Sequence, residues 1–356
     1  MFHPLRVSEV ERLTDDAVAL TFEVPPELRD RFLHTPGQHV ALRRKAVDAA
    51  APGGEIRRTY SICAPAGTEP VLRVGVRLVE GGQFSTYAFK ELAAGDTVEV
   101  MEPTGRFVLE PRPGYFAAIV GGSGITPVLS IVSTLLAREP EARFCLVRSD
   151  RTVASTMFLD EVADLKDRYP DRFQLVTVIS REEQQAGLST GRLDRQRLAQ
   201  LLPAMLPVAD VDGWFLCGPL GLVAGADRAL RGLGVDRSRI HQEIFHVDDA
   251  AAGTPALAPS APPVTGSTLT ATLAGRSGTW PVKDGEPLLE TVLRSRADAP
   301  YACRGGVCGT CRAFLVSGEV TMDRNFALEP EETDAGYVLA CQSHAATPDV
   351  ELDFDR

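Results

Sequence analysis

Short runs of apolar residues, separated by turn residues, occupy the first hundred positions of the chain. The clearest runs lie at 18–24, 40–42, 72–76 and 97–100, and Pro-Pro, Pro-Gly and Gly-Asp pairs lie between them. Regularly spaced short strands with such turns are typical of a small antiparallel β-barrel. One segment, 85–92, has the pattern of a short helix. The pattern therefore predicts a β-barrel domain over residues 1–112.

Strands alternate with helices in the next part of the chain. Apolar runs of strand length lie at 116–120, 144–147, 173–179, 214–217 and 240–244, and helical patterns lie at 125–137, 157–169, 193–201 and 220–230. Such alternation predicts a parallel sheet covered by helices, which binds ligands at the carboxyl ends of its strands. We assign residues 113–247 to this α/β domain.

The last part of the chain begins with a segment rich in alanine and proline. Residues 248–267 hold almost no large apolar side chain, which indicates a linker that its prolines partly extend. After it, the pattern predicts a hairpin at 269–273 and 279–282, a helix at 287–296, and strands at 312–316 and 337–339. We expect residues 268–356 to form a small α+β domain of the β-grasp type, so the whole chain is predicted to be a multidomain protein.

Four cysteines in this last domain form the most specific motif of the sequence. Cys303, Cys308 and Cys311 have the spacing Cys-x4-Cys-x2-Cys, and Cys341 follows thirty residues later. This is the plant-type spacing of a [2Fe–2S] cluster. Glycines between the ligands let a loop approach the inorganic sulfides closely. A structural zinc site is the alternative, although zinc is usually held by two separated cysteine pairs, and disulfides at such close spacing would be strained.

Two segments of the predicted barrel have the chemistry to bind a nucleotide. In Arg58-Thr59-Tyr60-Ser61, alternation along a strand places Arg58 and Tyr60 on one side. A guanidinium can hold a phosphate, and an aromatic ring can stack on a flat heterocycle. The second segment, 81–85, joins two glycines to a predicted helix start, where free N–H groups favour an anion.

The α/β domain has two candidate nucleotide-binding turns. The segment Gly121-Gly122-Ser123-Gly124 follows the first strand, where the pyrophosphate of a dinucleotide binds in such folds. Arg148, Ser149 and Arg151 follow the second strand and could pair with a 2′-phosphate, whereas Asp150 would repel it. The sequence therefore favours NADPH and leaves NADH open.

Composition and charge exclude some classes of function for this chain. The 356 residues are 44% hydrophobic and 24% charged, as in globular proteins, and the formal net charge is −11. Residues 268–356 hold fourteen Asp and Glu against eight Lys and Arg, which argues against a nucleic-acid partner.

Neither a leader nor a membrane span is expected. The first residues lack a charged and then apolar leader, and the uncharged stretch 114–137 contains glycines and Pro127, so we expect a buried strand and helix there. Single cysteines at 63, 145 and 217 indicate a reducing cytoplasm.

Taken in order along the chain, these motifs resemble the ferredoxin–NADP reductase superfamily. The resemblance covers Arg58–Ser61, Gly81–Ser85, Gly121–Pro127, Cys217-Gly218-Pro219 and the four cysteines. Within that superfamily, the chain most resembles the iron–sulfur flavoprotein reductases of bacterial oxygenases that have a C-terminal ferredoxin module. Segments 79–85, 151–161 and 165–173 are most similar to reductases that serve the diiron epoxidase of phenylacetyl-CoA. Reductases of ketosteroid hydroxylases and of hybrid cluster protein share the domain order and remain alternatives.

The resemblance implies FAD, a [2Fe–2S] cluster, and NADPH or NADH as cofactors, and an oxygenase component as partner. It places Ser61, Cys217 and Glu243 at the reacting atoms. The residues expected to bind FAD or the nucleotide are Arg58, Tyr60, Ser61, Gly82, Gln83, Phe84, Ser85, Gly122, Ser123, Gly124, Thr126, Pro127, Arg148, Ser149, Arg151, Cys217, Gly218, Pro219 and Phe245.

The order of the cofactors follows from how many electrons each exchanges. A hydride delivers two electrons and the cluster accepts one, so a flavin is expected between them. A tethered ferredoxin domain that moves between flavin and partner is a further hypothesis. The rival class of function is an electron carrier or redox sensor without NAD(P)H turnover.

Overall fold

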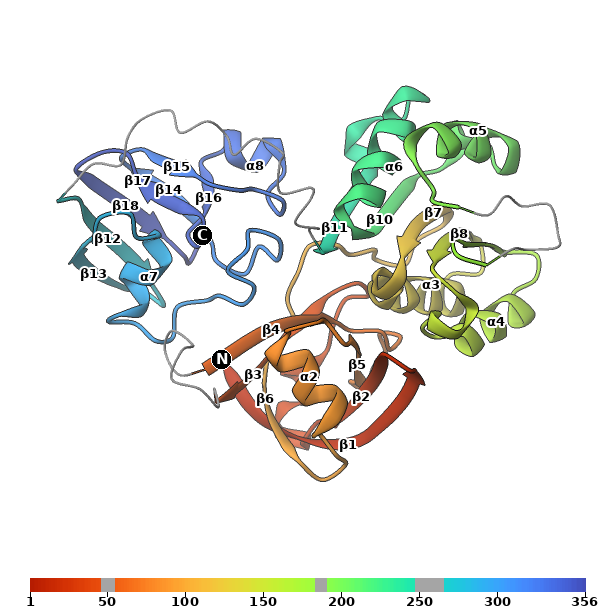
Figure 1. Ribbon diagram of the computed structural model, residues 1–356, viewed down its shortest axis with the longest axis horizontal. Helices are drawn as coiled ribbons and strands as arrows, with labels where there is room; N and C mark the ends of the chain where they lie inside the picture. The colour runs from red at the N-terminus through yellow and green to blue at the C-terminus, as the bar shows by residue number, and fades with distance from the viewer. Residues whose placement is uncertain (46–54, 183–190, 247–265) are drawn as a thin grey trace. The chain divides into compact units, whose positions relative to one another are not determined.

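The structure is a computed structural model that describes residues 1–45, 55–182, 191–246 and 266–356 (Figure 1). The chain divides into two compact units, one of Met1, Lys45–Thr59 and Ala252–Arg356 and the other of Phe2–Arg44 and Tyr60–Ala251. Of the predicted linker 248–267, only the last two residues are among those described. The linker and the predicted domain boundaries therefore stay predictions.

The predicted barrel is a six-stranded sheet in the order β4-β3-β6-β1-β2-β5. The pairs β1–β2, β1–β6, β2–β5 and β3–β6 are antiparallel. Helix α1 (Arg29–Phe32) follows β2, and α2 (Gln83–Lys90) follows β5 and begins two residues before the predicted helix. The strands are β1 (Phe2–Thr14), β2 (Ala17–Glu23), β3 (His39–Lys45), β4 (Glu55–Ser61), β5 (Leu72–Arg77) and β6 (Thr97–Met101).

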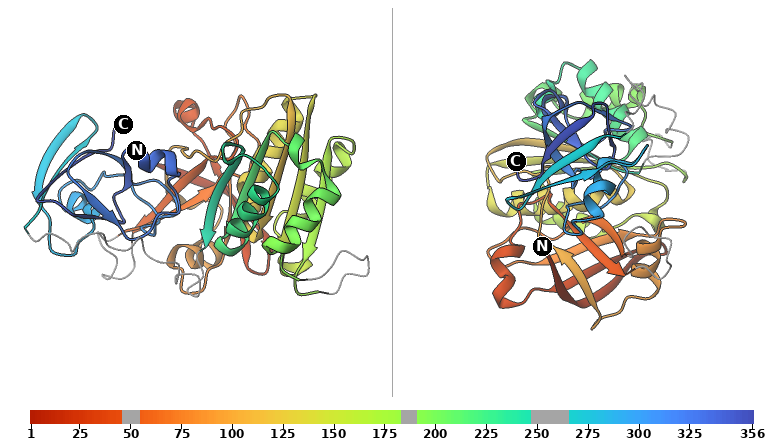
Figure 2. Two further views of the ribbon diagram at one scale, coloured as in Figure 1. Left: turned by 90° about the horizontal axis from the view of Figure 1, so that it is seen from above. Right: turned by 90° about the vertical axis from the view of Figure 1, so that its left-hand side faces the viewer.

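The α/β part contains the predicted parallel sheet, in the order β11-β10-β7-β8-β9 (Figure 2). All four neighbouring pairs are parallel. The strand order reverses between β7 and β10, which is where open α/β sheets bind their ligands. The elements are β7 (Gly114–Gly121), α3 (Ile125–Arg138), β8 (Ala142–Asp150), α4 (Leu159–Arg168), β9 (Phe173–Ile179), α5 (Arg195–Met205), β10 (Gly213–Pro219), α6 (Leu220–Gly232) and β11 (Ile240–His246).

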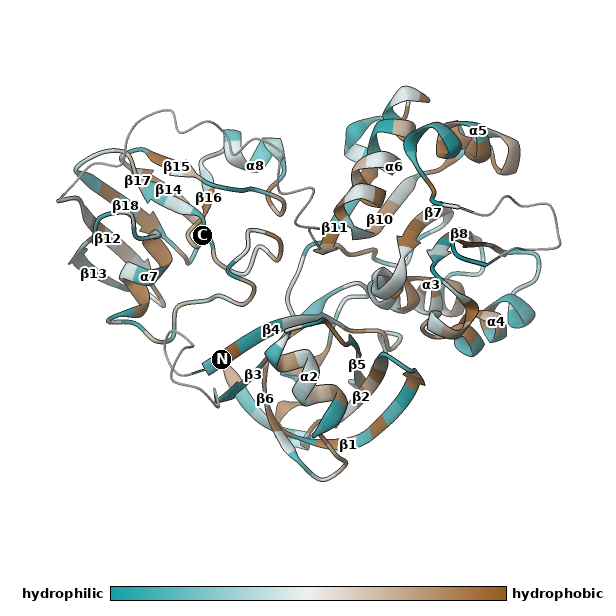
Figure 3. Ribbon diagram, in the orientation of Figure 1, coloured by the Kyte–Doolittle hydropathy of each residue, from teal (hydrophilic) through white to brown (hydrophobic). Residues whose placement is uncertain are grey.

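Apolar packing between β7 and α3 explains the uncharged stretch of the sequence. Phe116, Ala118 and Val120 of β7 share one buried cluster with Ile125 and Val128 of α3. Figure 3 shows the apolar residues along β7. In the described part of the chain, no helix combines the length and the apolar character that crossing a membrane requires.

Two turns at the carboxyl end of the sheet touch through their backbones. A Cβ atom on Gly124 would lie 2.2 Å from the carbonyl oxygen of Cys217, and one on Gly218 would lie 2.9 Å from the carbonyl oxygen of Gly121. Gly218 also has a φ of +139°, which side chains with a Cβ rarely adopt. Only glycine lets the turn after β7 and the end of β10 approach this closely.

The C-terminal domain contains a five-stranded sheet in the order β13-β12-β18-β14-β16 and a two-stranded sheet of β15 and β17. The predicted hairpin is confirmed as β12 and β13, which pair antiparallel. The sequence analysis did not predict β18, in which Asp and Glu alternate with only two apolar residues. The elements are β12 (Thr268–Leu273), β13 (Arg276–Pro281), α7 (Leu288–Leu293), β14 (Arg312–Ser317), β15 (Val320–Met322), α8 (Pro330–Asp334), β16 (Tyr337–Leu339), β17 (Ser343–Ala345) and β18 (Asp349–Asp353).

Residues 55–59 belong to the same unit as the C-terminal domain because of one buried arginine. Arg57 is 4% exposed and donates hydrogen bonds to the carbonyl oxygens of Ala297 and Ala299 at 3.0 and 3.2 Å. Its guanidinium lies 4.0 Å from the ring centre of Tyr301, whose hydroxyl donates to Glu55 at 3.1 Å. These contacts neutralise and satisfy Arg57 within the unit.

The close approach at Gly124 yields a stability prediction. Gly124→Ala should lower the free energy of unfolding by roughly 1–3 kcal/mol, because the added methyl overlaps backbone that has no room to move. Urea unfolding followed by the fluorescence of buried Trp214, in a Trp280→Phe background, reports on this unit. Gly221→Ala is the control, since a Cβ there meets nothing within 4 Å. Equal stability of the two variants would contradict the packing argument.

Candidate functional site

Three residues predicted at the reacting atoms lie together in the unit that contains the parallel sheet. Cys217 of β10 pairs in register with Glu243 of β11. Ser61, at the end of β4, places its hydroxyl oxygen 3.5 Å from Oε2 of Glu243. Ser61 and Cys217 are 4% and 0% exposed. The structure thus brings the three side chains together, while their catalytic role stays a prediction.

A histidine that the sequence analysis did not single out adjoins this group. His39 of β3 is 5% exposed, and its Nδ1 lies 3.7 Å from Oε1 of Glu243. Among the described residues, its Nε2 has no hydrogen-bond partner. Glu243 therefore lies between a hydroxyl and an imidazole, with one carboxylate oxygen facing each. A single histidine 204 positions away offers no local signal for this contact.

The environment of Cys217 keeps its thiol protonated. Burial raises the pKa of this thiol well above its usual value, and the negative charge of Glu243 raises it further. Cys63 lies in the same apolar core, where burial raises its thiol pKa to about 12. Cys217 is thus a neutral, buried thiol at neutral pH and not a nucleophilic thiolate.

The predicted FAD segments of the barrel meet through two aromatic rings. The ring centres of Tyr60 and Phe84 lie 5.6 Å apart at a tilted angle. Helix α2 starts at Gln83 without a side-chain cap, so its first N–H groups point outward as an anion site requires. Ser85 is 5% exposed and its hydroxyl donates to the carbonyl of Gly82 at 3.2 Å, so it closes the turn. Arg58 is exposed.

Thr126 packs against the barrel strand β5. Its side chain is 1% exposed, and its hydroxyl donates to the carbonyl of Ser123 at 2.9 Å. A Cβ atom on Gly75 of β5 would lie 2.8 Å from the Thr126 methyl group. The turn 121–124 is therefore held next to the barrel. Pro127 is buried in the first turn of α3, and Phe245 packs partly buried against the same core.

Arg148, predicted to bind a 2′-phosphate, lies inside the protein. It is 1% exposed, its Nε lies 2.9 Å from Oδ2 of Asp150, and its Nη2 donates to the carbonyl of Met157 at 2.9 Å. The two charges neutralise each other, so in this conformation Arg148 offers no free cation to a ligand and Asp150 does not repel one. Ser149 is partly exposed beside them.

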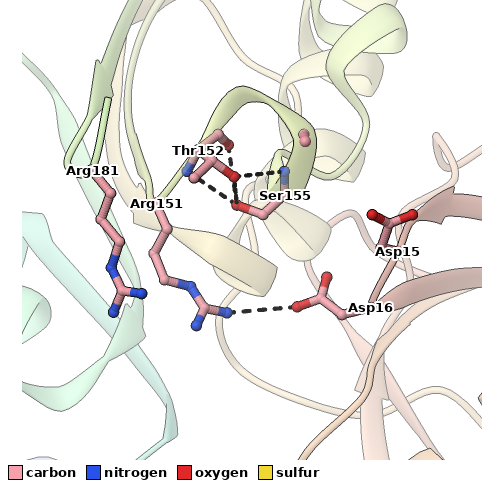
Figure 4. Close-up of a pocket in the computed structure, with 7 residues that line it drawn as sticks. Asp15, Asp16, Arg151, Thr152, Ser155 and Arg181 are labelled. Atoms are coloured by element: carbon pink, nitrogen blue, oxygen red, sulfur yellow. Dashed lines mark hydrogen bonds and ion pairs between the residues drawn. The ribbon is translucent and has the colours of Figure 1, made fainter. Parts of the chain in front are cut away.

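A surface pocket of about 320 Å³ lies beside the segment that follows β8 (Figure 4). Arg151, about half exposed, has Nη2 3.6 Å from Oδ2 of Asp16. Arg181, which the sequence analysis did not select, lies two residues after the end of β9, and its backbone N–H donates to the carbonyl of Arg151 at 2.9 Å. Two arginines thus meet at the carboxyl ends of β8 and β9. The lining residues are Asp15, Asp16, Arg151, Thr152, Ala154, Ser155 and Arg181.

The four cysteines of the C-terminal domain fit a two-iron cluster. Cys308 has the largest influence on the pKa of Cys303, and Cys341 has the largest influence on that of Cys311. Within the described ranges, no three or more side chains of His, Cys, Asp or Glu are grouped as a single-ion site requires. Two sulfur pairs match two bridged irons with two thiolates each.

The loop around the cysteines also supplies donors. The backbone N–H of Gly305 donates to Sγ of Cys303 at 3.3 Å. Such donors favour the thiolate form that binds iron. The donor set therefore fits the predicted [2Fe–2S] cluster.

Family models and relatives agree with this arrangement. Residues 4–109 match an oxidoreductase FAD-binding domain, residues 118–228 an oxidoreductase NAD-binding domain, and residues 271–346 a 2Fe-2S iron–sulfur cluster binding domain. The chain is 41% identical to one component of the 1,2-phenylacetyl-CoA epoxidase of Escherichia coli, over 99% of this chain and 98% of that protein. The chain belongs to the family of iron–sulfur flavoprotein reductases.

Other relatives extend the comparison. This reductase is 31% identical to the ferredoxin reductase component of 3-ketosteroid-9-alpha-monooxygenase of Rhodococcus rhodochrous, over 98% of this chain and 96% of that protein. Its fold matches phthalate dioxygenase reductase with a TM-score of 0.60 at 23% identity, over 99% of this chain and 98% of the other. The predicted fold class and the predicted cofactors FAD, a pyridine nucleotide and a [2Fe–2S] cluster are confirmed.

The protonated state of the buried thiols can be tested chemically. A rise in pKa from 9 to about 12 lowers the thiolate fraction of Cys63 at pH 8 by roughly a thousandfold. Cys63 and Cys217 of the native holoprotein should therefore react with iodoacetamide far more slowly than glutathione between pH 7 and 9, as measured by mass spectrometry. Both should be labelled in urea. Rapid labelling of native Cys217 at pH 8 would contradict the burial argument.

Proposed function

We propose that this reductase takes electrons from NADPH and passes them through FAD and the [2Fe–2S] cluster to the oxygenase component of a multicomponent monooxygenase. The partner proposed is a diiron epoxidase that acts on phenylacetyl-CoA. The observation that supports this choice is the 41% identity to a component of the Escherichia coli epoxidase over nearly the full length of both chains. The 3-ketosteroid monooxygenase component, at 31%, supports a Rieske-type hydroxylase as the second candidate.

The residues of the reductase position and protect the reacting atoms. Bound FAD exchanges electrons singly or in pairs, which links a two-electron hydride donor to a one-electron cluster. Tyr60 and Phe84 supply an aromatic surface, and the start of α2 supplies N–H groups for a diphosphate. Ser61 and Glu243, with Cys217 beside them, form a buried polar group that can hold a proton and exclude water.

The pocket beside β8 and β9 supports NADPH as the donor. Arg151 and Arg181 face the same pocket, which lies at the edge where an α/β sheet binds the nucleotide ribose (Figure 4). Guanidinium groups bind phosphate in a two-pronged geometry, and the buried Arg148–Asp150 pair adds no net charge. Asp15 and Asp16 also line this pocket, so a phosphate there would have to displace Asp16 from Arg151. The proposed phosphate ligands are therefore Arg151 and Arg181, with Arg148 in a supporting position beneath them.

Nucleotide choice is tested by removing one cation. Arg181→Ala should raise KM for NADPH roughly tenfold, since a hydrogen bond to a charged group contributes about 1.5–3 kcal/mol before solvent screening, and should change KM for NADH less than about twofold. Arg143→Ala, which removes an exposed cation at the opposite end of β8, is the matched control. A wild-type preference for NADH, unchanged in Arg181→Ala, would contradict this assignment.

The partner is tested by reconstitution. Purified reductase, NADPH and the diiron epoxidase components should consume phenylacetyl-CoA, whereas the same reductase with a ketosteroid hydroxylase component should turn over its steroid at least tenfold more slowly. A Cys303→Ser variant should still reduce a dye that takes electrons directly from the flavin. It should no longer support oxygenase turnover, because Cys303 is a cluster ligand. Faster turnover with the hydroxylase would establish the second candidate instead.

A further inference from the structure

Gln342 directly follows the fourth cluster ligand and is almost completely buried. The residue as a whole is 8% exposed. The amide nitrogen Nε2 lies 2.9 Å from the carbonyl oxygen of Arg304, 3.0 Å from the carbonyl oxygen of Cys341 and 3.6 Å from Sγ of Cys341. One amide group thus reaches both the loop that carries Cys303 and the ligand Cys341.

The chemistry of these neighbours determines which end of the amide faces them. A carbonyl oxygen only accepts hydrogen bonds, so the side-chain oxygen of Gln342 would be repelled by both carbonyls. The NH2 group therefore faces these acceptors. One proton points to the carbonyl of Arg304 at 2.9 Å, and the other is shared between the carbonyl oxygen and Sγ of Cys341 at 3.0 and 3.6 Å.

Backbone contacts hold Gln342 firmly in this place. Its N–H donates to the carbonyl of Leu339 at 2.8 Å, and its own carbonyl accepts from the N–H of Asp323 at 2.9 Å. A Cβ atom on Gly306 would lie 3.1 Å from Cγ of Gln342 and 3.0 Å from the carbonyl oxygen of Arg324. Gly306 has a φ of +76°, so both its conformation and its surroundings require glycine. The cysteine loop therefore packs directly on the Gln342 side chain.

We propose that Gln342 is a positioning residue that joins the Cys303–Cys311 loop to Cys341 and raises the reduction potential of the [2Fe–2S] cluster. Reduction adds one negative charge to the cluster and its thiolates. An N–H group directed at a ligand sulfur stabilises that charge more in the reduced state than in the oxidised state. The bond to Arg304 holds the amide where this donation is possible. The inference rests on the cluster and is independent of which oxygenase is the partner.

The test is a redox titration of the full-length holoprotein, followed by the EPR signal of the reduced cluster. Gln342→Met keeps the length of the side chain and removes both N–H donors. We expect the equilibrium constant for cluster reduction to fall roughly tenfold, which is a shift of about 59 mV to more negative potential for one electron. The flavin potential in the same sample should stay unchanged.

Ser343→Ala is the matched control. The Ser343 hydroxyl is buried and donates to the carbonyl of Leu339 at 2.9 Å, and within the described residues it forms no hydrogen bond with a cysteine. This variant loses a buried hydrogen bond at the neighbouring position and should keep the wild-type cluster potential. If Gln342→Met also keeps the wild-type potential and only loses its cluster faster on dilution, the residue is structural and the proposal is wrong.

A second variant, Gln342→Asn, tests the proposal if Gln342→Met does not assemble its cluster. Gln342→Asn keeps an amide that is one methylene shorter, so it loses its reach to Arg304 and retains a weak donor near the sulfur. Its potential should lie below that of the wild type. A wild-type potential in Gln342→Asn would overturn the proposal.

Discussion

The contact between two glycine turns is the constraint on which the nucleotide side of the molecule depends. Because Gly121, Gly124 and Gly218 have no side chains, the turn after β7 touches the end of β10 backbone to backbone. Strand pairing places Cys217 of β10 beside β7, where the strand order reverses, and Glu243 on the other side of Cys217, on β11. The contact between the turns also directs the start of α3 toward Gly75 of the barrel. One close approach thus holds residues from both domains around a common centre.

Elements with a strong apolar period could be predicted from the sequence, and the strands β1 and β18, which are rich in charged residues, could not. Strand β7 and helix α3 consist mostly of buried apolar residues, so their pattern is unambiguous. The sequence analysis did not define β1 as a strand, because Glu9, Glu11 and Arg12 interrupt its apolar residues. Local composition describes such a strand poorly, since pairing with β2 and β6 stabilises it.

The side-chain contacts of the candidate site could likewise be predicted only in part from the sequence. The spacing alone identified the four cysteines, because three of them lie in one loop and the fourth lies at one later position. It did not show that Arg148 turns inward to Asp150, nor that Arg181 reaches the pocket with Arg151. The contact between residues 151 and 181 depends on the register of β8 against β9, which joins residues about thirty positions apart, whereas Arg148 and Asp150 are two positions apart within β8. His39 and Glu243 meet through an even longer separation, which neither residue signals.

Glycines and buried polar side chains therefore have different structural roles in this reductase. Glycines allow backbone segments to approach where a ligand or a neighbouring turn needs the space, as at Gly124 and Gly306. Buried polar side chains then occupy the remaining gaps and direct a donor or an acceptor to one atom. Glu243 does so between Ser61 and His39, and Gln342 does so between Arg304 and Cys341. An unpaired polar group in such a place would cost about 1–3 kcal/mol, so the electrostatic surroundings of both redox sites depend on these few side chains staying in position.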